Sequence, residues 1–326
     1  MEKYRVGIVG ATGMVGQRFI SLLKDHPWFE VNCVAASARS AGKTYREAVG
    51  ERWAFSWEIP EKVAGMTVVD AADIDEVSKH VDFVFCAVDM KKDEIRALEE
   101  AYAKHEIPVV SNNSACRGIE DVPMVVPEIN ADHLAVIEAQ KKRLGTKNGF
   151  IAVKPNCSIQ SYVPALTPLL DFEPEKVSVC TYQAISGAGK TFKTWPEMVD
   201  NVIPYIGGED EKSENEPLKL WGHVEDGKIV NAALPVISAQ CLRVACSDGH
   251  MAAVSVSFKK KPTIEQIKER WANYETEAQR LELPSAPKPF LQYFEDPSRP
   301  QTRLDRDFQN GFGVSIGRLR EDKLFD

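Results

Sequence analysis

The chain has 326 residues, 44% of them apolar, and a formal net charge of −8 at pH 7, from 40 Lys and Arg against 48 Asp and Glu. This length and apolar content predict a globular protein of two domains, and the acidic balance argues against a nucleic acid or a membrane surface as the main partner. The seven cysteines are odd in number and lack C-x-x-C spacing, which predicts reduced thiols without a disulfide framework or a metal site. Because no leader is recognisable and no apolar run approaches the roughly 18 residues of a membrane helix, we expect a cytoplasmic protein.

The start of the chain has the order strand, glycine-rich turn, helix. An apolar run at residues 4–9 is followed by GATGMVG at residues 10–16 and then by the amphipathic QRFISLLKDH. Glycines at such a turn let the backbone approach a pyrophosphate held at the helix N-terminus. The spacing is G-x-x-G-x-x-G rather than G-x-G-x-x-G, but its place between a strand and a helix favours a dinucleotide-binding site.

The second expected strand, residues 31–35, ends without the acidic residue that would hold a ribose 2′-hydroxyl. Four polar residues follow it instead: Ser37, Arg39, Ser40 and Lys43. Hydroxyl, guanidinium and ammonium groups suit a 2′-phosphate. The sequence therefore favours NADP over NAD, with a solvated basic loop as the alternative.

Strands and helices continue to alternate, with strands expected at residues 66–69, 81–88 and 108–111 and a polar-faced helix at 91–105. This order predicts an α/β fold with a doubly wound parallel sheet of the Rossmann type. Ligands of such sheets bind beyond the carboxyl ends of the strands. The loop SNNSACRG at residues 111–118 falls there and offers amide, hydroxyl and guanidinium groups to a phosphate or a carboxylate.

We expect the crossing into the second domain in a helical stretch near residues 130–144, with the first domain at 1–133 and the second at 134–326. The second domain is expected to be α+β, with strands near 177–185 and on both sides of a turn at Ser247 to Gly249, and an amphipathic helix at 263–280.

Cys157 is the strongest candidate nucleophile. It follows an extended stretch at residues 150–153 and precedes an apolar run from Ile159 that is expected to be a helix. The N–H groups and dipole of a first helical turn favour a thiolate, and the N–H groups of Cys157 and Ser158 would hold an oxyanion. The alternative is a small buried apolar side chain.

A cysteine nucleophile needs a base, and six histidines are candidates. His250 is preferred because it directly follows the tight turn ending at Gly249 and lies in the same half of the chain as Cys157. A histidine at the start of a strand can equally be structural, so the interpretation rests on the combination.

Eight blocks of sequence occur in order between residues 5 and 320: GATGMVG, ASARSAGK, SNNSACR, KPNCS, QAISGAGK, GGEDEK, LRVACSDGH and QNGFGVSIGR. In this set the chain resembles the aspartate-semialdehyde dehydrogenase family, in the branch common in archaea and fungi. The resemblance implies NADPH-dependent reductive dephosphorylation of L-4-aspartyl phosphate to L-aspartate 4-semialdehyde through a thioester on Cys157, in the biosynthesis of lysine, threonine, methionine and isoleucine. It also implies a homodimer or homotetramer with subunit contacts through the sheet of the second domain.

The resemblance implies a role for each matching residue. Cys157 would accept the acyl group and His250 would be the acid/base. Asn113, Arg117 and Lys212 would bind the phosphate of the substrate, Arg243 its α-carboxylate and Glu209 its ammonium group. Gln183 would orient the substrate, and Asn156 would also bind it. Other Glu and Lys residues near 209–219 could match instead of Glu209 and Lys212. The cofactor would be bound by Gly10, Thr12, Gly13, Met14, Val15, Ser37, Arg39, Ser40, Cys86, Ser114, Ser158, Ser186, Gly187 and Asn310.

Two other functions stay open at this point. A malonyl- or succinyl-coenzyme A reductase of the same fold would use the same cysteine chemistry, so the catalytic residues do not identify the acyl donor. A non-catalytic NADP-sensing module is disfavoured by the joint presence of Cys157, Gln183, Arg243 and His250. In the family the last block is followed by one more strand and a closing helix, so we expect this sequence to be a shortened form of a longer chain.

Overall fold

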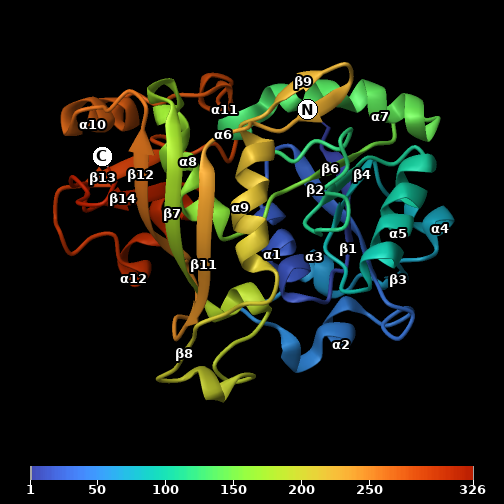
Figure 1. The fold of residues 1–326 in the computed structure, drawn as a ribbon. Helices are drawn as coiled ribbons and strands as arrows, with labels where there is room; N and C mark the ends of the chain where they lie inside the picture. Colours follow the sequence, from blue (N-terminus) through green and yellow to red (C-terminus); the bar gives the residue numbers. More distant parts are fainter. Residues whose placement is uncertain (1, 326) are drawn as a thin grey trace. The chain divides into compact units, whose positions relative to one another are not determined.

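The structure is a computed structural model and describes residues 2–325. The chain divides into two compact units (Figure 1). The first unit contains the residues up to Val125, Asp132–Lys154 and Val224–Ile229, and the second contains Val126–Ala131, Pro155–His223 and the residues from Val230 on. This division differs from a boundary at residue 133, because residues 134–154 supply a helix and an edge strand to the first unit.

The first unit is built on a six-stranded parallel sheet in the order β3-β2-β1-β4-β5-β6. The strands are β1 (Tyr4–Val9), β2 (Phe29–Ala36), β3 (Val69–Asp70), β4 (Phe83–Cys86), β5 (Val109–Ser111) and β6 (Ile151–Val153). The helices are α1 (Met14–Leu23), α2 (Tyr45–Val49), α3 (Glu61–Ala64), α4 (Ile74–Ser78), α5 (Lys92–Lys104) and α7 (Ile137–Leu144). The expected doubly wound α/β sheet is confirmed.

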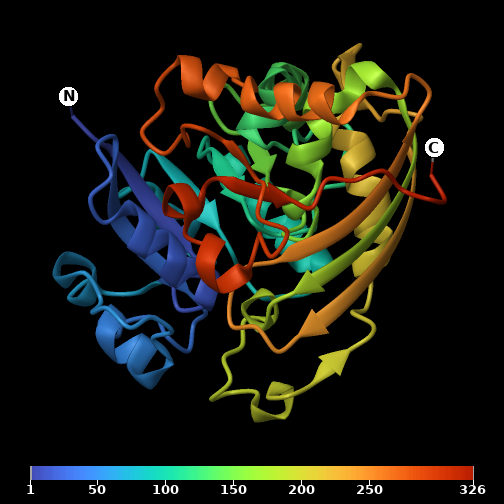
Figure 2. The same cartoon turned by 90° about the vertical axis from the view of Figure 1, so that its left-hand side faces the viewer.

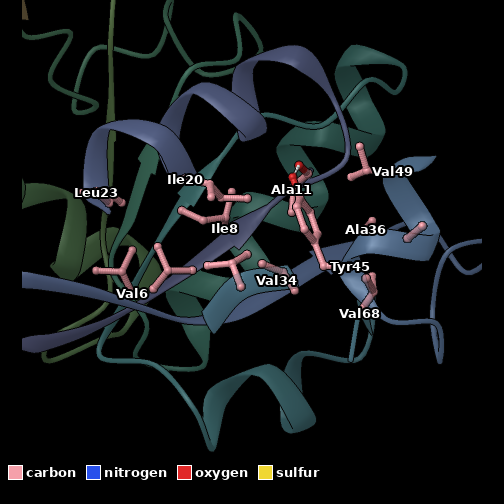
Figure 3. Packing of buried hydrophobic residues seen from close by; sticks show 13 residues of the cluster. Val6, Ile8, Ala11, Ile20, Leu23, Val34, Ala36, Tyr45, Val49 and Val68 are labelled. Carbon is pink, nitrogen blue, oxygen red and sulfur yellow. Dashed lines mark hydrogen bonds between the residues drawn. The ribbon is translucent and has the colours of Figure 1, made fainter. Parts of the chain in front are cut away.

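Apolar side chains between α1 and the sheet position the glycine-rich turn. Ile8 and Ile20 are fully buried, and they pack with Val34 in one cluster (Figure 3). Burial of such side chains contributes about 1.5–3 kcal/mol each, which holds α1 against β1. Within the same cluster the buried Tyr45 hydroxyl donates to Ala11 O at 2.8 Å, so the first residue after Gly10 is also tied to α2.

The second unit contains a four-stranded mixed sheet in the order β12-β7-β11-β8. Its long strands are β7 (Pro174–Gln183), β11 (Val236–Val244) and β12 (Met251–Phe258), with β8 (Val202–Ile203) at one edge. β7 and β11 pair in parallel. β12 pairs antiparallel with β7 at one edge of the sheet, and β8 pairs antiparallel with β11 at the other. Figures 1 and 2 show α9 (Glu209–Leu220) lying along β11. Buried and exposed residues alternate along β11, so one face of the sheet is exposed to solvent in this chain.

The remaining elements of the second unit are α6 (Pro127–Asn130), α8 (Val163–Leu166), α10 (Ile264–Ala272), α11 (Glu277–Arg280), α12 (Thr302–Asp305) and a parallel pair, β13 (Leu291–Phe294) and β14 (Val314–Gly317). A short hairpin that belongs mostly to the first unit joins β9 (His223–Glu225) to β10 (Lys228–Val230). The single helix expected at 263–280 is instead α10 and α11, because Thr276 begins a new helix with its own capping box.

Among residues 2–325, none of the helices has the length and apolar content needed to cross a membrane. The same residues form no group of three or more His, Cys, Asp or Glu side chains placed to hold a metal ion.

Candidate active site

The structure brings Cys157 and His250 together. The Sγ atom of Cys157 lies 3.3 Å from Nε2 of His250. Cys157 is half-buried, in the turn before the segment that carries Ile159. His250 stands directly before β12, after Gly249, whose φ of 89° is one that glycine adopts without strain. A nucleophile and a hydrogen-bonding imidazole within reach of each other form the minimal pair for covalent catalysis.

The helix expected after Cys157 is broken into short pieces. A 3-10 helix at Ile159–Ser161, α8, and a second 3-10 helix at Thr167–Phe172 follow one another. Pro164 and Pro168 explain the breaks, because a proline removes a backbone donor and crowds the preceding turn. A strong helix dipole at Cys157 is therefore not a feature of this site.

Ser158 is hydrogen-bonded within the turn of Cys157. Its N–H donates to Asn156 Oδ1 at 2.8 Å, and its hydroxyl donates to the same oxygen at 2.7 Å. The hydroxyl also lies 3.1 Å from Ser213 Oγ, and the residue is fully buried. The Ser158 N–H and hydroxyl thus both bond within the protein, and a contact of Ser158 with an oxyanion or a cofactor stays a prediction.

Asn156 links Cys157 to the start of α9. Its side-chain nitrogen lies 3.0 and 2.9 Å from the two carboxylate oxygens of Glu209, and its N–H donates to Glu216 Oε2 at 2.5 Å. Because its side-chain oxygen accepts from Ser158, both the amide oxygen and the amide nitrogen of the buried Asn156 are hydrogen-bonded. We infer from these contacts that Asn156 positions the turn of Cys157, in place of the direct substrate contact expected from the sequence.

Glu209 is the centre of a buried polar network. Besides Asn156, it accepts from Lys212 Nζ at 2.8 Å and from Gln183 Nε2 at 3.3 Å. Burial by itself raises the pKa of Glu209, but the hydrogen bond and charge of Lys212, with the amides of Asn156 and Gln183, outweigh burial and lower the pKa below its usual value. Glu209 is therefore held as a carboxylate whose oxygens already have donors.

Gln183 and Arg243 are neighbours on adjacent strands. They are paired in the register of β7 and β11, and both are buried. Nη1 of Arg243 donates to Ala184 O at 2.7 Å. Burial lowers the pKa of Arg243, and the nearby Cys157 and Glu209 oppose this shift; a guanidinium still remains charged at neutral pH. The site thus contains a buried, oriented cation suited to a carboxylate.

Gly187 lies against both polar groups of the site. A Cβ atom at this position would be 2.9 Å from Arg243 Nη1 and 2.9 Å from both Cε1 and Nε2 of His250. A side chain here would displace either the guanidinium or the imidazole. Cofactor binding by Gly187 and by Ser186, whose N–H donates to Ser247 O at 3.1 Å, stays a prediction.

The glycine-rich turn of the first unit has the form of an anion cradle. Gly10 has φ of 90°, and a Cβ on it would lie 2.2 Å from Ala87 O, so only glycine fits. At Gly13, the N-cap of α1, a Cβ would meet only Gly10 O at 3.5 Å, and no side chain caps the helix. The N–H groups of Met14 and Val15 begin the helix and have no partner within it. The backbone there is open to an anion.

The loop after β2 carries exposed Ser37 and Arg39 and a half-buried Ser40. The Ser40 N–H donates to Ser37 O at 2.8 Å, which closes a tight turn. Arg39 is therefore displayed on a short turn at the carboxyl end of the strand, as the 2′-phosphate hypothesis requires.

The loop after β5 differs from expectation at Asn113. Its side-chain nitrogen donates to Glu99 Oε1 at 2.9 Å and to Cys86 Sγ at 3.4 Å. Glu99 is fully buried on α5 and also accepts from the hydroxyl of Ser111. Asn113 therefore turns its donors inward and anchors the loop, and it does not present them to a phosphate. Arg117 donates to Asn112 O at 3.2 Å in the same loop.

Three further residues were predicted to bind the cofactor: Cys86, Ser114 and Asn310. Cys86 is buried at the end of β4, and burial, with the charge of Glu99, raises the pKa of its thiol, so it stays protonated. Ser114 is half-buried in the loop after β5, and Asn310 is exposed with φ of 57°. These roles stay predictions.

Two residues, one in each unit, that hold candidate site residues in place were missed from the sequence. Ala184 acts through its backbone, which no side-chain pattern reveals. Glu99 looks like part of a solvated helix face, and only its place on a buried stripe, four residues after Ile95 and three before Tyr102, could have pointed to it.

Two family models match the chain: the semialdehyde dehydrogenase NAD-binding domain at residues 5–137 and the semialdehyde dehydrogenase dimerisation domain at residues 166–326. They define the class as a two-domain dehydrogenase. The chain is 43% identical to the aspartate-semialdehyde dehydrogenase of Archaeoglobus fulgidus, over 98% of this chain and 90% of the relative. It is 44% identical to that of Schizosaccharomyces pombe, over 99% of this chain and 90% of the relative.

A solved structure of aspartate-semialdehyde dehydrogenase with NADP from Candida albicans matches with a TM-score of 0.89 and 37% identity, covering 100% of this chain and 91% of that one. The chain belongs to the aspartate-semialdehyde dehydrogenase family, whose archaeal and fungal members are among these relatives. The resemblance drawn from the eight sequence blocks is confirmed.

Proposed function

We propose that this protein catalyses the NADPH-dependent reductive dephosphorylation of L-4-aspartyl phosphate to L-aspartate 4-semialdehyde. The observation that carries the proposal is the 3.3 Å contact between Cys157 Sγ and His250 Nε2 beside the buried Arg243, in a chain of this family. The relatives' names favour an acyl phosphate over an acyl-coenzyme A as the donor, and the intact site argues against a non-catalytic sensor.

The first unit fits a dinucleotide with a 2′-phosphate. The open backbone at Gly13 and the start of α1 would receive the pyrophosphate, and Arg39, in place of an acidic residue after β2, would pair with the 2′-phosphate. The Candida albicans relative has a solved structure with NADP. When bound, NADPH supplies the hydride.

In the proposed chemistry, the Cys157 thiolate attacks the acyl carbon of the substrate, its sulfur forms a bond to that carbon, and the phosphate leaves with the bonding electrons. The product of this step is a thioester, and its reduction releases the aldehyde and regenerates the thiolate. Arg243 binds the α-carboxylate in a planar, two-bond contact. The acid/base role of His250 stays a prediction from the resemblance.

The polar network around Glu209 would orient the substrate. A substrate ammonium group would share the Glu209 carboxylate with Lys212, Asn156 and Gln183. Lys212 would then be partly released from the Glu209 carboxylate. We propose Lys212 and Arg117 as the phosphate ligands. Asn113 is proposed to hold the loop of Arg117, consistent with its inward contact to Glu99.

We propose that the exposed face of the four-stranded sheet contacts a second copy of the chain. Val236 is 63% exposed on β11, and Tyr182 is exposed on the same face of the adjacent strand β7. The matching family model is named a dimerisation domain. A homodimer or homotetramer and a cytoplasmic location stay predictions from the sequence.

The test is phosphate-dependent reduction of NADP by aspartate semialdehyde, which runs the reaction in reverse. We expect turnover that requires phosphate or arsenate and is lost in Cys157→Ser, with the melting temperature unchanged. Coenzyme A in place of phosphate is the control. Turnover that depends on coenzyme A, or equal turnover in Cys157→Ser, contradicts the proposal.

A further inference from the structure

The backbone of Ala184 contacts two polar side chains of the site, His250 beside Cys157 and the buried Arg243. Its N–H donates to His250 Nδ1 at 3.0 Å, and its carbonyl accepts from Arg243 Nη1 at 2.7 Å. The segment after Ala184 is fixed as well, since the N–H of Ile185 donates to Cys246 O at 2.9 Å. A single buried peptide segment at the end of β7 therefore sets the positions of both groups.

The contact to Nδ1 determines where the imidazole carries its hydrogen. A backbone N–H can only donate, so Nδ1 must be the unprotonated, accepting nitrogen. The neutral ring then carries its hydrogen on Nε2, the atom 3.3 Å from Cys157 Sγ. Turning the ring by 180° would place carbon atoms at both contacts and lose both hydrogen bonds.

A hydrogen on Nε2 makes the cysteine sulfur the acceptor of this pair. To take up the thiol proton, His250 would need a free lone pair on Nε2 and a hydrogen on Nδ1, which would face the hydrogen of the Ala184 N–H at 3.0 Å. Two donors facing each other lose the hydrogen bond and leave a part-buried donor unsatisfied. The thiol proton would therefore leave to solvent.

We propose that the Ala184 N–H fixes His250 as a neutral donor through Nε2 to a Cys157 thiolate, so that His250 does not store the thiol proton in the resting protein. This inference rests on the proposed function, since it concerns the same nucleophile. Ala184 is a positioning residue, and His250 acts by donating a hydrogen bond.

Arg243 supplies the positive charge that a neutral imidazole lacks. Nη1 of Arg243 and Nε2 of His250 both lie 2.9 Å from the point where a Cβ on Gly187 would be. The guanidinium and the imidazole therefore both border the backbone of Gly187, and the guanidinium is held there by the Ala184 carbonyl. A fixed cation stabilises a thiolate without proton transfer.

The direct test is nitrogen NMR of the whole protein labelled with ¹⁵N-histidine at neutral pH. The signals of His250 are assigned by their loss in His250→Gln. We expect Nδ1 to have the shift of an unprotonated ring nitrogen and Nε2 that of a protonated one. A hydrogen on Nδ1, or hydrogens on both nitrogens, overturns the inference.

An ester in place of the peptide bond before Ala184 tests the backbone contact. A lactate residue at position 184 replaces the N–H by an oxygen and adds no atom toward His250, whereas the Cδ of a proline would collide with Nδ1. Ala184→Gly keeps the N–H and is the matched control. We expect the Nδ1-protonated form to appear in the ester variant, with kcat lower by about 10²-fold, and neither change in Ala184→Gly. An unchanged tautomer in the folded ester variant overturns the inference.

A second pair at position 250 separates donation from proton storage. Gln can place an amide N–H near the position of Nε2, whereas Asn is too short to reach the sulfur. We expect His250→Gln to retain at least about tenfold more activity than His250→Asn, against the 10²–10⁴-fold range typical of acid/base groups. Equal losses would show that His250 must carry the proton. Absence of any wild-type turnover with aspartate semialdehyde would refute the proposed function, while the NMR result would still decide the tautomer.

Discussion

The two units hold their polar groups in opposite ways. In the first unit the start of α1 at Met14 and Val15 offers open backbone, and Arg39 is exposed. In the second unit Glu209 is only 9% exposed, and each polar group around it is bonded to another. Open backbone can bind an anion whatever the side chains are, whereas a closed network depends on every member. Substitutions of polar site residues should therefore lower stability and activity more in the second unit than in the first.

Glu209→Ala is expected to have the largest effect, because it leaves Lys212, Asn156 and Gln183 without their shared acceptor. We expect the free energy of unfolding to fall by about 3 kcal/mol, and kcat/KM to fall by about 10²-fold, as Asn156 positions the turn of Cys157. Urea unfolding and steady-state kinetics measure both. Glu211→Ala, an exposed residue in the same helical turn, is the control and should change stability by less than about 0.5 kcal/mol. Similar values for the two variants would remove Glu209 from the network.

Arg39→Ala should affect binding without affecting the fold. Loss of a charge-assisted contact is worth about 1.5–3 kcal/mol, so NADP should bind about 10- to 100-fold more weakly, while NAD affinity stays nearly constant. Binding titrations with both cofactors measure this. Arg46→Ala, at an exposed arginine paired with Glu61, is the control. Equal losses for NADP and NAD would show that Arg39 does not select the cofactor.

Glu99→Gln tests whether the first unit contains a closed network of its own. The glutamine oxygen can still accept from Ser111 and Asn113, but as a neutral and weaker acceptor. We expect stability to fall by about 1 kcal/mol, and KM for phosphate to rise severalfold at constant kcat. Asp93→Asn, in the exposed first turn of α5, is the control. A fall in kcat with KM unchanged would contradict a role limited to the loop.

The smallest expected effect is a pH dependence. Because the pKa of Glu209 is lowered in the folded chain from an ordinary value of 4.5, its contribution to stability is fully present above that value. This contribution is lost as the pH falls through the lowered pKa. The difference in unfolding free energy between wild type and Glu209→Gln should be constant near neutral pH and shrink in acid. A difference that grows in acid would mean that the pKa is raised.

Sequence patterns predicted the first unit well because its signals are local. The glycines at 10–16 lie between a buried strand and an amphipathic helix, a pattern that adjacent residues reveal, although Ala35 and Tyr45 on other elements also hold the turn. Cys157 and His250 were paired from residue type and turn position alone, although 93 positions separate them. The resemblance, not the spacing, then supplied the reaction.

Other features depended on tertiary contacts. The apolar run after Cys157 has helical periodicity, but Pro164 and Pro168 divide it. The direction of the Asn113 amide depends on Glu99, which lies on a different element. The placement of His250 by Ala184 involves only a backbone donor. A sequence lists side chains, so a contact made by the peptide bond cannot be seen in it.

The bond from Tyr45 to Ala11 bears on how the dinucleotide turn moves. The N–H groups of Gly10 and Ala11 both donate to Ala35 O, at 2.9 and 3.0 Å, while the Ala11 carbonyl receives the Tyr45 hydroxyl. The inner half of the turn can open only together with β2 and α2, whereas the outer half at Gly13 has no such tie to them. Hydrogen exchange should therefore be slow at Ala11 and fast at Met14 and Val15. The turn would then fluctuate only where it meets the ligand.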